Sequence, residues 1–151
     1  MKKTGCLFAL LLIIGSISSL NAQSYYSDAQ VYAFKQGMLD QTRKTIKSLP
    51  IKTSSNLTLI AIGVTEDLIT YKYVVEGLSN NSNVTADNWD YMKLVLMNNL
   101  VQSQKSPELF IECLYRTGLG FQFLFFSEER LYIGGFRVSY SDYEELLLNN
   151  G

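Results

Sequence analysis

The chain has 151 residues, with 13 Lys and Arg, 14 Asp and Glu, and no His. Without histidine, Ser-His-Asp and Cys-His nucleophile pairs, histidine metal sites and histidine general bases are excluded. Two cysteines are too few for a cysteine-cluster zinc site, and the charge balance lacks the concentrated positive surface that nucleic acid binding requires.

The first 22 residues have the three parts of a secretory signal peptide. Lys2 and Lys3 precede an unbroken apolar run at residues 7–14, and small and polar residues follow up to Ala22. Eight apolar residues are too few to span a bilayer. We therefore expect cleavage after Ala22 and a periplasmic or secreted protein with no stable membrane insertion once the leader is removed.

Cleavage would leave residues 23–151 as a single domain with enough chain to bury its own core. Two of the 13 basic residues leave with the leader, so 11 basic residues face 14 acidic ones, a net charge of −3. Cys6 is lost too, and the remaining Cys113 can form no internal disulfide. We expect packing to stabilise the domain and Cys113 to be a buried structural thiol.

The first helix is predicted to begin at a capping box formed by Ser27 and Gln30 and to end before Pro50. Apolar or small residues recur at steps of three and four along it, which is the spacing of one helix face. They are Val31, Phe34, Met38, Thr42, Ile46 and Leu49. Residues 56–65 and 68–76 then predict two strands joined by a tight turn.

A polar loop at residues 77–85 separates these strands from two further helices. The first begins at Thr85 or Asp87 and carries an apolar stripe. The second begins at Ser106-Pro107-Glu108, with a cap, a proline at the first helical position and an acid in the first turn, and ends at Gly118.

Residues 120–126 and 131–138 predict a second strand pair. Gly134 and Gly135 interrupt its second strand, which indicates a bulge. Ser141 and Glu144 predict the capping box of a short terminal helix. The complete order α-β-β-α-α-β-β-α predicts an α+β fold, a four-stranded antiparallel sheet with helices packed on one face.

This layout resembles a loose set of small exported bacterial α+β proteins of the Bacteroides type. The matching residues are Leu49-Pro50, Thr58-Leu59, Tyr71-Lys72-Tyr73, Cys113 and Gly120-Phe121-Gln122-Phe123. The resemblance covers most of the mature chain. It implies the α+β fold and no shared activity.

Carboxylates are the remaining candidates for catalysis. Glu128 and Glu129 fall in a predicted hairpin turn, and Glu144 falls in a helical first turn. Two such acids facing each other across a cleft can hydrolyse a glycosidic bond, whereas turn acids are usually solvated and helix-start acids usually serve the helix dipole. No phosphate-binding loop or calcium loop is present in the sequence, so we expect no cofactor.

The predicted strands carry different side chains on their two faces. Phe121, Phe123 and Phe125 share one face and are expected to form the core beneath the helices. The opposite face mixes polar and apolar groups, and exposed apolar surface of that kind is typical of partner sites. Its members are Thr58, Ile60, Ile62, Val64, Thr70, Lys72, Val74, Gln122, Leu124 and Phe126.

Our leading hypothesis is an exported, non-enzymatic protein-binding domain, such as a periplasmic inhibitor or immunity protein that neutralises an antibacterial toxin. The expected partner-binding residues are Ile60, Ile62, Val64, Lys72, Leu124 and Phe126. Two alternatives stay open: an accessory subunit of an envelope assembly, and a small envelope-polysaccharide hydrolase that uses a pair among Glu128, Glu129 and Glu144.

Overall fold

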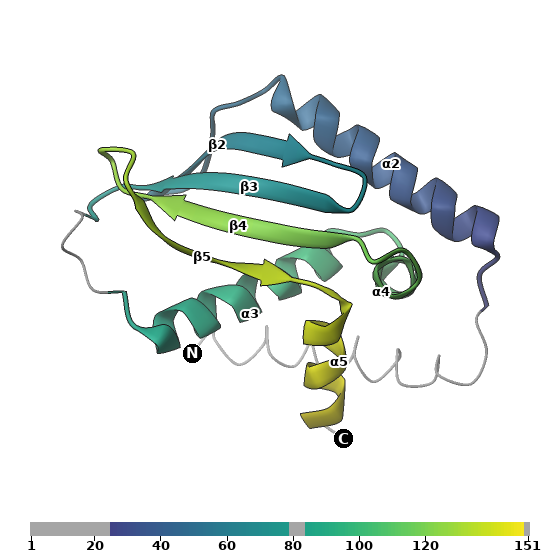
Figure 1. Ribbon diagram of the computed structural model, residues 1–151. Coiled ribbons are helices and arrows are strands. Elements are labelled where there is room, and N and C mark those ends of the chain that lie inside the picture. Colours follow the sequence, from purple (N-terminus) through teal and green to yellow (C-terminus); the bar gives the residue numbers. More distant parts are fainter. Residues whose placement is uncertain (1–24, 79–83, 150–151) are drawn as a thin grey trace.

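A computed structural model describes residues 25–78 and 84–149 (Figure 1). The expected signal peptide and most of the polar loop lie outside the described residues. The elements in chain order are α2 (Asp28–Ile46), β1 (Ile51–Ser54), β2 (Leu57–Val64), β3 (Leu68–Val75), α3 (Ala86–Gln102), α4 (Pro107–Thr117), β4 (Gly120–Phe126), β5 (Tyr132–Val138) and α5 (Tyr140–Asn149).

The five strands form one mixed sheet in the order β1-β2-β3-β4-β5. The two predicted hairpins are antiparallel, but β3 and β4 pair in parallel, with Ile69 opposite Phe121 and Tyr73 opposite Phe125. The prediction of a purely antiparallel, four-stranded sheet was therefore wrong. The connection between β3 and β4 contains both α3 and α4, which is long enough for the chain to return and enter the sheet in the same direction.

The strand that the sequence did not predict is β1, at the edge of the sheet. It has four residues, begins directly after Pro50 and pairs with β2, with Ile51 opposite Leu59. A run this short shows no clear alternation, so only the pairing with β2 defines it as a strand.

Several local sequence signals are confirmed. Ser27 and Gln30 form the reciprocal capping box at the start of α2, and Gly118 ends α4 in the left-handed conformation with a φ of 69°. The terminal helix begins two residues earlier than predicted. Ser139, not Ser141, stands before α5, and its backbone N–H donates to the carboxylate of Asp142 at 2.7 Å. The acid three residues after Ser139 makes this the better cap.

The helices cover one face of the sheet, which confirms that part of the predicted fold (Figure 1). Phe121, Phe123 and Phe125 point into this face and are 1%, 2% and 0% exposed. The Tyr71 ring stacks on Phe123 at 5.3 Å and the Tyr73 ring on Phe125 at 5.5 Å. The aromatic rows of adjacent parallel strands thus form the centre of the core.

A bulge in β2 changes which of its residues face the helices. Leu59 pairs with Tyr73, but the next pair joins Ala61 to Lys72, so Ile60 is an extra residue. After the bulge Ile62 pairs with Tyr71 and Val64 with Ile69, on the helix-covered face. The sequence prediction assumed unbroken alternation and placed both on the opposite face, which was wrong for this physical reason.

The predicted bulge in β5 is present next to its two glycines. Phe125 pairs with Gly134 and Phe126 with Tyr132, which leaves Ile133 as the extra residue. A Cβ on Gly134 would lie 2.5 Å from Cζ2 of Trp89, so the absence of a side chain lets the indole of α3 pack directly on the strand.

Candidate functional site

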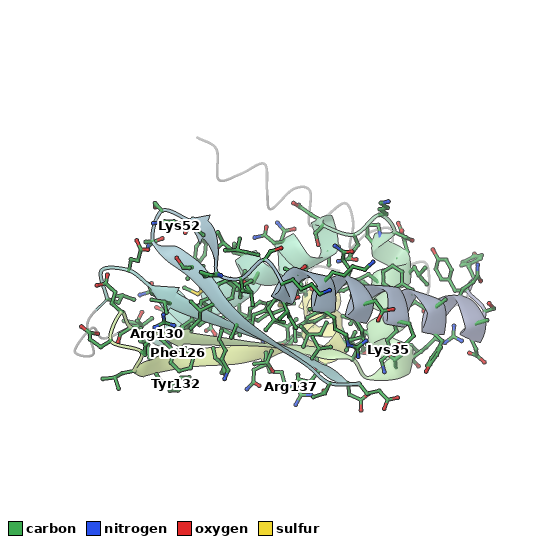
Figure 2. All side chains as sticks on the ribbon, turned by 90° about the horizontal axis from the view of Figure 1, so that it is seen from above. Lys35, Lys52, Phe126, Arg130, Tyr132 and Arg137 are labelled. Carbon is green, nitrogen blue, oxygen red and sulfur yellow. The ribbon has the colours of Figure 1, made fainter. Side chains whose placement is uncertain are left out.

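The face of the sheet opposite the helices carries a row of apolar side chains. Val74 of β3 lies beside Phe126 of β4, and Phe126 meets Tyr132 of β5 edge to face at 5.8 Å between ring centroids. Tyr132 is 62% exposed. Figure 2 shows Phe126 and Tyr132 close together near one end of the sheet, with Arg130 beside them. We call this surface, formed by Ile60, Lys72, Val74, Leu124, Phe126, Tyr132 and Arg137, the open face.

The charges on the open face have one sign. Lys72 of β3 and Arg137 of β5 are both exposed, and no ion pair joins either of them to a residue that the structure describes. Their strand neighbours on this face are uncharged, since Lys72 lies opposite Leu124 and Arg137 opposite Gln122. The open face therefore combines apolar and cationic groups.

Four of the six predicted partner-binding residues lie together on the open face. Lys72 and Leu124 are direct neighbours across β3 and β4, and Phe126 follows on the same side of β4. Ile60 follows the buried Leu59 and therefore points to the opposite side, toward the open face. Ile62 and Val64 belong to the other face of the sheet, where Ile62 lines a second surface.

That second surface is a groove between α2 and α3 on the helix-covered side. One part of it has a volume of about 770 Å³. Phe34 and Met38 of α2 form one wall. Leu100 of α3 and Gln104, which follows that helix, lie opposite, and Ile62 contributes from the sheet. The second part, about 540 Å³, extends along α3 past Met92, Val95 and Leu96 toward β1.

The two parts adjoin, because Tyr71, Leu100 and Ser103 line both. We refer to them together as the α2–α3 groove. Burial raises the pKa of the Tyr71 phenol, and a hydrogen bond with the Thr42 side chain partly offsets that effect. The phenol at the centre of the groove is therefore neutral near pH 7. The surface was missed from the sequence because its walls come from segments far apart in the chain.

The carboxylates proposed for hydrolysis are spread over the molecule. Glu128 and Glu129 precede β5 and Glu144 follows it, so a seven-residue strand, about 23 Å long, separates them. Glu128 accepts a hydrogen bond from the backbone N–H of Gly77 at 2.7 Å. The Ser127 side chain and a backbone N–H lower the pKa of Glu129, which is the opposite of what a general acid needs.

Another carboxylate, Asp142, has a structural role. Burial by itself would raise its pKa, but hydrogen bonds from Lys93 and Ser139 outweigh that effect and lower it. Asp142 therefore remains ionised and joins α3 to the start of α5 through Lys93. This arrangement favours anchoring of the helix rather than proton transfer.

Cys113 is fully buried in α4, as expected for a structural thiol. Burial raises its pKa, although the Thr117 hydroxyl and the charge of Lys35 oppose the shift. The thiol is therefore a poor nucleophile at neutral pH. Within residues 25–78 and 84–149, no group of three or more His, Cys, Asp or Glu side chains is arranged to hold a metal ion.

None of the helices in the described ranges is both long enough and apolar enough to cross a membrane. No family model matches the chain, and no curated protein does so either.

Three solved structures are similar in their arrangement of helices and strands. The pilotin EpsS of the Vibrio vulnificus type 2 secretion system is 9% identical, with a TM-score of 0.49 over 78% of this chain and 97% of its own. The type II secretion system pilotin AspS from Vibrio cholerae is 14% identical, with a TM-score of 0.45 over 73% and 96%. A Pseudomonas aeruginosa protein described as secreted is 11% identical, with a TM-score of 0.45 over 78% and 99%. Likeness at this level carries no inference about function.

Proposed function

We propose that this protein is an exported, non-enzymatic domain that binds a protein partner through the open face of its sheet. The observation that carries the proposal is the composition of that face, where Phe126, Tyr132 and Leu124 lie beside Lys72 and Arg137. When the outer face of an antiparallel strand pair contacts water alone, apolar inward-facing residues normally alternate with polar outward-facing residues along each strand. Here β4 carries Phe126 and Leu124 on its outer side instead.

The residue types on the open face suit a binding surface. Aromatic residues and arginine are enriched at the centres of protein interfaces, where they carry much of the binding energy. Lys72 and Arg137 carry charges that no described carboxylate neutralises. A partner with an acidic and apolar patch would match this surface in both respects, and opposite charge would also speed association.

Two kinds of partner fit this proposal. One is a component of an envelope assembly, which this protein would serve as an accessory subunit, and we adopt that version. The other is an antibacterial toxin, which this protein would neutralise. The two versions use the same surface, so the identity of the partner distinguishes them.

The test is affinity purification of the tagged protein from its native host after cross-linking, compared with variants of the open face. We expect one stoichiometric protein partner for the wild type, lost by Phe126→Lys and weakened by Lys72→Glu. Tyr91→Lys serves as the matched control, because Tyr91 is 63% exposed but belongs to α3, on the other side of the sheet.

Circular dichroism and thermal unfolding must show that the variants keep the fold. A partner captured equally well by wild type, Phe126→Lys and Lys72→Glu would overturn the open-face proposal. An envelope component as the partner would support the accessory role, and a toxin would support neutralisation.

A further inference from the structure

The α2–α3 groove is a gap in the helical layer, on the side of the sheet away from the open face. Both helices contact α4, but between them the apolar surface of the sheet is only partly covered. Tyr71 and Ile62 form the floor of this gap, and Phe34 and Leu100 stand at its sides. A further helix lying there would continue the layer, since helices pack with axes about 8–10 Å apart.

The wall of the groove contains a glycine, Gly37, at a position where no contact within the described residues requires one. It lies in the middle of α2, and a Cβ added to it would meet no atom of the described residues within 4 Å. Glycine in a helix interior is destabilising relative to alanine. Neither packing nor an unusual backbone angle requires a glycine here, so its absent side chain leaves room for something that approaches the α2 backbone.

The charge of the groove limits what that occupant can be. Among the described residues that line it, Lys105 is the charged one, beside neutral amides and hydroxyls such as Gln41 and Ser103. The exposed Lys44 lies one helical turn beyond Gln41 on α2. Within the described ranges, neither Lys44 nor Lys105 forms an ion pair. The walls therefore favour an apolar occupant that carries acidic groups at its edge.

We propose that the α2–α3 groove binds an amphipathic α-helix of a partner protein. Its apolar side packs on Tyr71, Phe34 and Leu100, its backbone passes over Gly37, and its carboxylates face Lys105. Helices in grooves bind through apolar residues at positions i, i+3, i+4 and i+7, and small residues in the wall allow close approach of two helix backbones. The part of the groove that contains Gly37 and Lys105 lies between α2 and the end of α3, and the edge strand β1 borders only the other part. An occupant seated over Gly37 therefore packs between helices.

Methionine methyl groups report directly on the groove. Met38 lines one part of it and Met92 the other, while Met97 is 3% exposed in the core and serves as an internal control. The probe is a synthetic helical peptide of about 18 residues, long enough to be helical alone, with Leu at the i, i+3, i+4, i+7 positions and Glu on its flanks. In methyl NMR of the purified protein we expect this peptide to shift the Met38 and Met92 signals and to leave Met97 unchanged.

Variants test the role assigned to each wall. Gly37→Leu should weaken peptide binding at least about tenfold while raising the thermal midpoint, because leucine favours the helix but fills the approach to α2. Lys105→Glu should weaken binding of the Glu peptide and strengthen binding of a matched peptide with Lys in its place. Phe126→Lys on the open face is the control and should leave peptide binding unchanged, so this test is independent of the proposed function.

Three results would overturn the proposal. The first is the absence of Met38 and Met92 shifts with the Leu and Glu peptide. The second is unchanged affinity in Gly37→Leu. The third is an equal response to a scrambled peptide of the same composition or to a single-chain fatty acid, which would show a general apolar pocket rather than a site for a helix.

Discussion

The two faces of β4 have similar side chains in different surroundings. Phe121, Phe123 and Phe125 point toward the helices and are at most 2% exposed, whereas Leu124 and Phe126 on the other face are partly exposed. Adjacent phenylalanines of one strand thus differ in their solvent exposure, because helices lie over one side of the sheet. Apolar character alone does not decide burial in this molecule.

This difference separates two roles. On the covered face, aromatic rings from adjacent strands stack on one another and on Trp89 of α3, so these side chains hold the sheet and the helices together. On the open face, the aromatic pair Phe126 and Tyr132 contacts no aromatic ring of the helices that the structure describes. We therefore expect covered-face substitutions to reduce stability and open-face substitutions to reduce binding.

The largest expected contrast comes from two neighbouring residues. Phe125→Ala should lower the free energy of unfolding by about 3–5 kcal/mol, because Phe125 is fully buried against Tyr73, Trp89 and Phe136. Phe126→Ala should lower it by about 1 kcal/mol, since the ring is already partly solvated. Urea denaturation of both variants measures the difference. Equal losses would mean that something covers the open face.

Two glycines give a smaller version of the same contrast. Gly134→Ala should destabilise the protein by about 1–3 kcal/mol, because the new Cβ would lie 2.5 Å from Trp89 and the indole would have to move. Gly63→Ala on the outer side should change stability by about 0.5 kcal/mol or less, because its Cβ would make an ordinary contact of 3.7 Å with Thr70. Thermal unfolding of the pair checks this, and a tolerated Gly134→Ala would contradict the packing of Trp89 on β5.

The smallest effect is confined to alkaline pH. Burial, and then the charge of Tyr71, raise the pKa of Tyr73 from 10.0 to about 12. Because the pKa is raised in the folded state, the neutral phenol of Tyr73 contributes to the free energy of unfolding. This contribution is fully present below about pH 10 and is lost as the pH rises toward 12. Tyr73→Phe should make this alkaline loss less steep, by up to about 1 kcal/mol per pH unit.

Denaturant titrations from about pH 7 to 12 measure the effect. Below about pH 9 the wild type and Tyr73→Phe should show parallel pH dependence, which is the internal control. Identical slopes above pH 10 would contradict the burial of the Tyr73 phenol on the covered face.

Much of the fold could be predicted because the signals were local. A capping box needs only Ser27 and Gln30, a left-handed helix end needs Gly118, and a hairpin needs two strands and a short turn. The strand β1 and the parallel pairing of β3 with β4 could not be predicted in this way. They depend on how the chain returns after α3 and α4, which no short stretch of sequence encodes.

The candidate site was predicted in part for the same reason. Ile60, Lys72, Leu124 and Phe126 follow from alternation along regular strands, but one extra residue in β2 moved Ile62 and Val64 to the other face. The α2–α3 groove was missed altogether. Gly37, a glycine inside a strong helical pattern, was the sequence signal that could have pointed to it.

By itself the sequence determined which segments form the helices and most of the strands, because propensity, capping and periodicity act over a few residues. It also determined that histidine chemistry is absent. Only the tertiary structure decided which face of the sheet the helices cover, where the bulge in β2 falls and how α2, α3 and the sheet enclose a groove. These features depend on contacts between residues far apart in the chain, and such contacts form only when the whole domain packs.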